Sequence, residues 1–203
     1  MKEITLLAAL ALLGALLRAA EPALTQEERA QAIRLLNESR EEFVKSVEGL
    51  TDAQWTYKPG PDRWSVGEVA EHILLSEGGL FSRMQEALAN KPNPDWETKT
   101  AGKTEFLMRV MPNRDRKAQA PEPLQPQSKM TRAQIMSQYR EARARTLKFI
   151  RETELPLKAH TAEHPFPVFN TLNAYQWLIY IPLHNIRHDK QIEEVKASSG
   201  FPR

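Results

Sequence analysis

Apolar residues recur at intervals of three, four and seven positions along four stretches of the chain. This is the period of a helix that buries one face. The first three stretches begin with a capping box, in which a Ser or Thr and a Glu or Gln three positions later accept each other's backbone amide hydrogens. No alternating strand pattern and no internal repeat is present. The predicted helices cover residues 25–50, 65–89, 131–155 and 171–197.

Residues 91–130 differ from the rest because they are rich in proline and have little helical periodicity. Only the stretch KTEFLMRVM, residues 103–111, has the pattern of a short helix. A connection of this length lets the second and third helices run in an arrangement other than a hairpin. The predicted fold is an all-α four-helix bundle with a long crossover, which holds Pro92, Pro94, Pro112, Pro121, Pro123 and Pro126.

The first 20 residues, MKEITLLAALALLGALLRAA, have the composition of an export signal. Lys2 supplies a positive head, and an apolar run from Ile4 to Leu17 follows, too short to span a membrane comfortably. Arg18 makes cleavage after Ala20 unfavourable. On the basis of the positive head and the apolar run, we predict a signal peptide over residues 1–20 and a periplasmic or secreted protein. An uncleaved leader, on a cytoplasmic or membrane-associated protein, and a first core helix are the alternatives.

The composition limits the kind of protein that residues 25–200 form. The chain has 203 residues, 41% hydrophobic and 27% charged, which suits one globular domain. Its net charge of +2, with no basic run among aromatics, argues against a nucleic-acid partner. The absence of cysteine excludes disulfides, thiolate metal sites and a cysteine nucleophile.

Polar residues interrupt the core line of the last predicted helix. His184 and His188 are one turn apart, and Gln191 follows on the same line. Buried imidazoles need a hydrogen-bond network or a metal ion to offset the cost of burial. The line runs through Ala174, Trp177, Ile181, His184, His188, Gln191 and Val195, so we expect the two histidines to face the bundle interior.

Two histidines at i and i+4 point the same way and can share one ion, but a useful site needs a third ligand. His72, at the edge of the apolar face of the second helix, completes a three-histidine site if the second and fourth helices pack together. Nitrogen ligands without cysteine favour Zn, Ni, Fe or Mn, and the pattern does not choose among them. The alternative is a pair of hydrogen-bonded or surface histidines with no metal.

Two other polar residues are candidates near such a site. Gln191 is positioned to orient a ligand, or to make a hydrogen bond within the bundle. Arg40 interrupts the apolar face of the first helix, where it would hold an anionic substrate group or extend to the rim. Tyr139 is interpreted as a core residue, and His164 as a residue near the mouth of the site rather than a ligand.

The segments DRWSVGEVAEHI (62–73) and LHNIRHDKQIEEVK (183–196) together resemble the DinB-like superfamily. The connecting segments 113–126 and 164–178 are similar too, so the resemblance covers most of residues 25–200. It implies an up-down-down-up bundle and one divalent metal ion held by His72, His184 and His188. One departure is Asn170, which stands where many relatives have glycine, so that loop is expected to differ in shape.

Some members of that superfamily are thiol-dependent transferases, and many have no assigned reaction. The resemblance therefore implies a metal-dependent transferase or hydrolase acting on a small molecule, in some cases with a thiol cosubstrate. A non-catalytic bundle that binds a metal or ligand, or that uses its histidines structurally, is the alternative. A homodimer is compatible with either interpretation.

Overall fold

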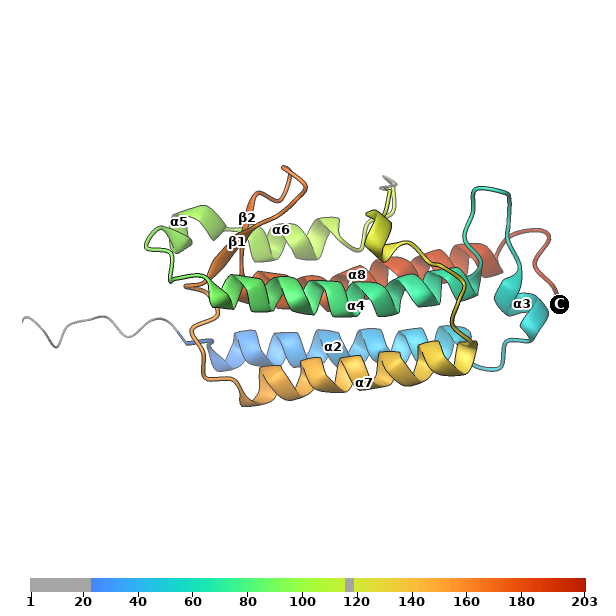
Figure 1. The fold of residues 1–203 in the computed structure, drawn as a ribbon, viewed down its shortest axis with the longest axis horizontal. Coiled ribbons are helices and arrows are strands. Elements are labelled where there is room, and N and C mark those ends of the chain that lie inside the picture. The colour runs from blue at the N-terminus through green and yellow to red at the C-terminus, as the bar shows by residue number, and fades with distance from the viewer. Residues whose placement is uncertain (1–22, 116–118) are drawn as a thin grey trace, which may run out of the picture.

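The computed structural model describes residues 23–115 and 119–203, so the predicted signal peptide lies outside the described residues. Four long helices form the body of the molecule (Figure 1). They confirm the predicted all-α bundle and lie within two to three residues of the expected bounds. The four are α2 (Gln26–Val47), α4 (Val66–Ala89), α7 (Arg132–Glu152) and α8 (Ala174–Lys196).

The four helices have the up-down-down-up order that the resemblance implied. In Figure 1, α2 and α8 run in one direction, while α4 and α7 run in the other. Both α4 and α2 pack against α8 and against α7, so α8 lies between α4 and α2. The packing of α4 on α8 is the condition under which His72 meets the other two histidines.

Capping boxes begin these helices as the sequence predicted. The side chains of Thr25, Ser65 and Thr131 each accept the backbone N–H of the residue three positions later. The side chain of that residue in turn accepts the backbone N–H of the Thr or Ser. Each box satisfies two backbone donors that a helix start otherwise leaves without partners. These contacts are local in sequence, which is why the pattern alone identifies them.

The crossover between α4 and α7 contains short helices rather than extended chain alone. The predicted helix at residues 103–111 is present as α6 (Lys103–Val110), which lies beside α8 (Figure 1). Within the described residues, no helix is long and apolar enough to cross a membrane. The other short helices are α3 (Asp52–Thr56), which precedes α4, and α5 (Trp96–Thr100) and η1 (Glu122–Leu124) in the crossover.

The prediction that the last helix begins at Thr171, with no strand before it, is wrong. Residues Thr161–Glu163 (β1) and Thr171–Asn173 (β2) form an antiparallel pair, and α8 begins after Asn173. Three-residue strands are too short to show an alternating pattern. In the loop between them Asn170 has φ of 52°, in the left-handed region, which glycine and asparagine adopt at least cost.

The interior divides into two apolar clusters, one at each end of the bundle. Between them lies Arg143 of α7, which is fully buried. Its guanidinium binds Glu77 of α4 at 2.8–3.1 Å, Ser39 of α2 at 2.7 Å and Asn185 of α8 at 2.9 Å. One side chain thus joins all four helices. Tyr139 is buried, as the sequence analysis interpreted it, whereas Arg143 was not anticipated as an interior residue.

Candidate metal centre

The structure brings His72, His184 and His188 together where α4 packs on α8. One nitrogen from each ring lies within 4.8 Å of the others. The Nε2 atoms of His72 and His188 are 3.2 Å apart. Three imidazole nitrogens this close, from two rigid helices, have the donor type and spacing of a transition-metal site.

Hydrogen bonds orient two of the three rings. The Nδ1–H of His72 donates to the backbone carbonyl of Leu124 at 2.7 Å, and the Nδ1–H of His188 donates to the Gln191 side-chain oxygen at 2.9 Å. Each bond places the proton on Nδ1 and leaves the Nε2 lone pair for a ligand bond. The predicted role of Gln191 as an orienting residue is consistent with this contact.

Burial keeps the three rings in the neutral form that a metal requires. Removal from water lowers the pKa of His72 below its ordinary value, against the opposing effect of the Leu124 carbonyl. Burial lowers the pKa of His184 and of His188 further, and the neighbouring histidines add to the effect. Neutral imidazoles with free lone pairs do not need to lose a proton before they bind a cation.

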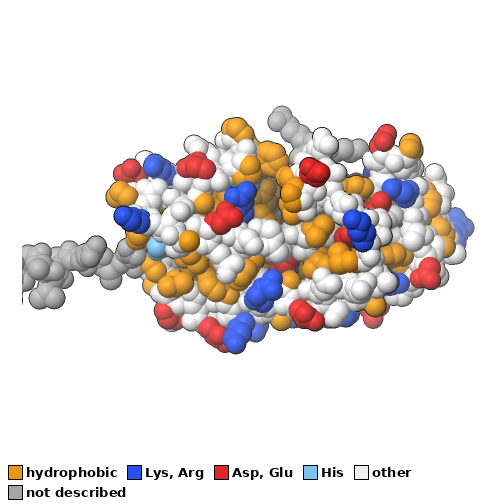
Figure 2. Space-filling view, viewed as in Figure 1, with side chains coloured by type: hydrophobic (Ala, Val, Ile, Leu, Met, Phe, Trp, Pro, Cys, Tyr) orange, Lys and Arg blue, Asp and Glu red, His pale blue; other side chains and the backbone are white. Residues whose placement is uncertain are grey.

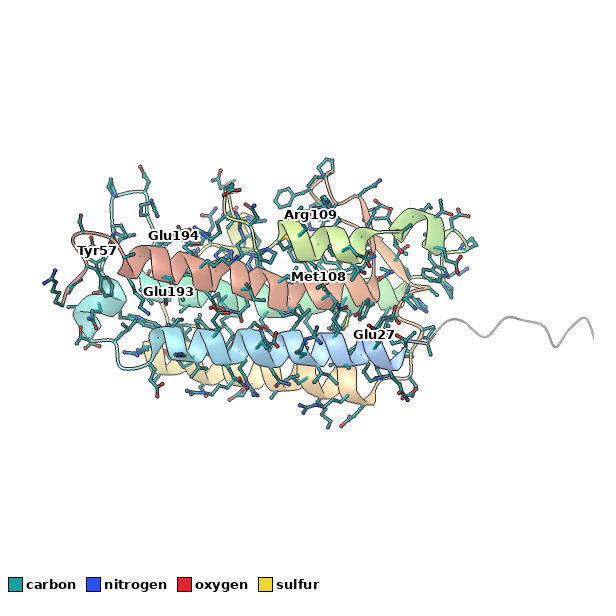
Figure 3. The ribbon with its side chains drawn as sticks, turned by 180° about the vertical axis from the view of Figure 1, so that it is seen from behind. Glu27, Tyr57, Met108, Arg109, Glu193 and Glu194 are labelled. Atoms are coloured by element: carbon teal, nitrogen blue, oxygen red, sulfur yellow. The ribbon has the colours of Figure 1, made fainter. Side chains whose placement is uncertain are left out.

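Residues of the crossover support both oriented rings. Leu124, which accepts from His72, belongs to η1. Arg114 donates to the Gln191 side-chain oxygen at 3.1 Å and binds Glu194 at 2.6 and 2.9 Å. Glu194 lies on the side of α8 turned away from α2 (Figure 3). The crossover therefore supports His72 directly and His188 through Gln191.

A buried carboxylate holds the crossover in place beside the histidines. Glu71, the residue before His72, accepts the backbone N–H groups of Gln127 and Ser128 at 3.0 and 2.9 Å. Its side chain is almost fully buried. Sequence analysis did not identify Glu71, Arg114 or Leu124, because their partners are far away in the chain or are backbone atoms.

The histidines face a cavity on the outer side of the α4–α8 pair, which corrects the prediction that they face the bundle interior. The side of α8 that faces α7 carries Asn185, which accepts the Tyr139 hydroxyl at 2.7 Å and donates to Asp189 at 2.9 Å. Burial raises the pKa of Asp189 to about 8. Other helices cover one side of α8 and the crossover covers another. The helix therefore has two buried faces, and the histidines lie on the one beneath the crossover.

The cavity has a volume of about 600 Å³. It is lined by α4 and the loop before it, by α8, by the crossover and by the β1–β2 loop. Figure 2 shows a hollow bordered by hydrophobic side chains on this face, above α4. His164 lines the cavity, as expected of a residue near the mouth, and its ring stacks on Trp177 at 4.9 Å between centroids. The volume is within the range of small-molecule sites in proteins.

Arg40 does not line this cavity. Its guanidinium lies 3.7 Å from the carboxylate of Glu41, and its side chain is 40% exposed. The structure thus places Arg40 away from the three histidines, with its head group at the rim of the bundle. The expectation that it would hold a substrate group has no support from this position.

The DinB superfamily model matches residues 35–192, a span that contains all three histidines. The chain belongs to the DinB superfamily. The uncharacterized protein YuaE of Bacillus subtilis (strain 168) is 27% identical over 168 residues, which cover 80% of this chain and 95% of YuaE. The relationship therefore extends over nearly the whole of that relative.

Among solved structures, the chain is similar to YfiT from Bacillus subtilis, with a TM-score of 0.57 and 17% identity. The match covers 90% of this chain and 94% of YfiT. YfiT is described as a probable metal-dependent hydrolase with an unusual four-helix bundle topology. At this identity the similarity establishes the fold, which agrees with the up-down-down-up order of the DinB chain described above.

Proposed function

We propose that this DinB-superfamily protein is a metal-dependent hydrolase whose substrate is a small molecule bound in the cavity. The observation that supports the proposal is the convergence of three neutral imidazoles on the wall of a cavity of about 600 Å³. His72, His184 and His188 would hold one divalent ion, of Zn, Ni, Fe or Mn. The description of YfiT as a probable metal-dependent hydrolase supports the same reaction class.

The residues present fit such an ion in donor type, charge and orientation. A divalent cation held by three imidazoles supplies Lewis acidity toward a substrate oxygen or a water molecule. The chain's own contribution is to hold the rings, through the Leu124 carbonyl and Gln191, and to cover the site with the crossover. The cavity then brings the substrate beside the three histidines.

Metal binding is tested by elemental analysis of the purified protein and of the His184→Ala variant. We expect about one transition-metal ion per chain in the wild type and a loss of at least tenfold in the variant. His160→Ala is the matched control, because His160 binds the Asn90 carbonyl at 2.8 Å and does not line the cavity. Undiminished metal in His184→Ala would contradict the assignment.

Catalysis is tested separately, with the metal-loaded protein and a panel of ester, amide and phosphoester substrates. Turnover that requires His184 but no thiol supports hydrolysis. Turnover only with an added thiol would indicate a transferase instead, with the thiol as cosubstrate, since the chain has no cysteine. If the protein binds one ion per chain but shows no turnover with or without thiol, the non-catalytic metal-binding alternative is favoured.

A further inference from the structure

Positive side chains predominate around the cavity that holds the three histidines. Asp62 is the single acidic residue that lines it within the described part of the chain. The excess of positive charge favours an anionic ligand. The four arginines are Arg63, Arg83, Arg114 and Arg187.

These arginines differ in how firmly their present partners hold them. Arg114 is bound in two places by Glu194 and also donates to Gln191, so it is part of the support for His188. Arg83 pairs with Glu86 at 2.8 Å, but both side chains are about half exposed, at 46% and 56%. An exposed pair of this kind contributes little, so Arg83 can exchange Glu86 for a ligand at small cost.

Arg187 precedes His188 on α8 and donates to the backbone carbonyl of Asn113 in the crossover. A guanidinium carries five N–H groups in a planar fork. Arg187 also lines the cavity, so its guanidinium is placed to meet an anionic group there. Arg187 lies three residues after His184 on α8, so the two side chains share one side of the helix, and both line the cavity.

Three stacked rings form an aromatic wall in the same cavity. The ring of His164 is nearly parallel to Trp177 at 9° and to Tyr180 at 15°, with centroids 4.9 and 5.6 Å away. Arg83 and Arg187 line the same cavity as these three rings. Both arginines are thus within electrostatic reach of the same aromatic wall.

We propose, on the basis of the function proposed above, that the substrate combines a planar apolar part with an anionic carboxylate or phosphate group. The planar part packs on the partly exposed ring of His164, which is itself stacked on Trp177 and Tyr180, since offset stacking on aromatic rings suits a flat ligand. Arg83 and Arg187 bind the anionic group, because the guanidinium fork matches two oxygens of a carboxylate or phosphate.

The test uses benzoate and phenylphosphonate as anionic probes, with benzamide as a neutral probe of matched shape. Binding is measured by titration calorimetry on the purified protein, on Arg83→Met and on Arg187→Met. We expect both anions to bind at least about tenfold more tightly than benzamide, the effect of one charge-assisted hydrogen bond. Each variant should lose about tenfold in anion affinity with no change for benzamide.

Two controls separate this result from metal binding and from misfolding. Arg34→Met removes an exposed arginine outside the cavity, whose partner is Glu38, and should leave all three affinities unchanged. The titrations are repeated in His184→Ala, so that the preference for anions is measured whether or not an ion binds. Circular dichroism confirms that each variant is folded.

Three outcomes would overturn the proposal. They are equal affinities for benzoate and benzamide, no binding of any probe, and wild-type anion affinity in both arginine variants. In the third outcome, the preference for anions could still disappear in His184→Ala. That result would assign anion binding to the metal ion rather than to the arginines. If only the proposed metal site is wrong, the arginine-dependent preference for anions remains, so the failure of the proposed function is distinguishable from the failure of this inference.

Discussion

The Nδ1 atom of His72 lies 2.7 Å from the carbonyl oxygen of Leu124, a residue 52 positions later in the chain. This contact means that the crossover, and not α4 alone, sets the tautomer of a proposed metal ligand. Leu124 also packs closely on α4 at residue 79, where a Cβ added to the glycine would lie 3.2 Å from the Leu124 side chain. The crossover is therefore a functional part of the site as well as a connection.

We expect Glu71→Gln to weaken metal binding without unfolding the bundle. The Gln127 and Ser128 N–H groups each donate to a different oxygen of the carboxylate, and an amide would replace one of these oxygens with an NH2 group, which is a donor. The crossover would then hold the Leu124 carbonyl less firmly against His72. We expect a loss of about tenfold in metal affinity, typical of groups that orient ligands, measured by competition with a chelator. Glu122→Gln, an exposed acid in the same crossover, is the control and should bind metal as the wild type does.

Gln191→Ala should also reduce metal affinity, by about tenfold or more, because His188 loses the oxygen that accepts its Nδ1–H. Gln191→Glu keeps an acceptor oxygen toward both His188 and Arg114 and should recover most of the affinity. Chelator competition measures both variants. Equal affinities for the Ala and Glu variants would show that this contact does not orient the ring.

Removal of one partner from the interior ion pair should destabilise the whole bundle. Arg143→Met leaves the buried Glu77 carboxylate without its cation, and Glu77→Met does the reverse. We expect each single change to lower the free energy of unfolding by about 3–5 kcal/mol, measured by urea denaturation. The double variant buries no unpaired charge, so its loss in free energy of unfolding should be much smaller than the sum of the two single losses. Additive losses would indicate that the pair is not coupled.

His164 should contribute to the loss of stability in acid. Burial lowers its pKa from 6.5 to about 4. Below pH 6.5 the unfolded chain therefore takes up a proton that the folded ring does not, so stability falls as the pH drops toward 4. We expect the free energy of unfolding of His164→Asn to depend less on pH between 7 and 4.5 than that of the wild type. An unchanged pH dependence would show that the ring is not protected from protonation.

The main helices were predictable because their signals are local. Thr25 with Glu28 and Ser65 with Glu68 are three residues apart, and the apolar spacing repeats within a single helix. The strands of the β1–β2 pair were not predicted, because three residues carry no periodic signal and their bonds join segments eight or more positions apart. The start of α8 at Ala174, after the strand that ends at Asn173, follows from that pairing.

The candidate site was predictable in its ligands and not in its surroundings. His184 and His188 share one helical face, and His72 reaches them once α4 packs on α8. Which face of α8 they occupy was not predictable, because α8 is covered on two sides and both faces look apolar in sequence. Arg40 shows the limit of the same reasoning. A charged residue within an apolar stripe can face a site or the rim, and its position is decided only by the neighbouring helices.

By itself, the amino-acid sequence determined the four helices, the capped starts of the first three and the three imidazoles capable of sharing an ion. Each of these depends on spacing within one helix or on a family pattern. Only the tertiary structure decided that the crossover orients two of those imidazoles, that Arg143 joins the four helices, and that arginines and aromatic rings share one cavity. The physical reason is that these relationships join atoms distant in the chain, some of them backbone carbonyls that every residue possesses.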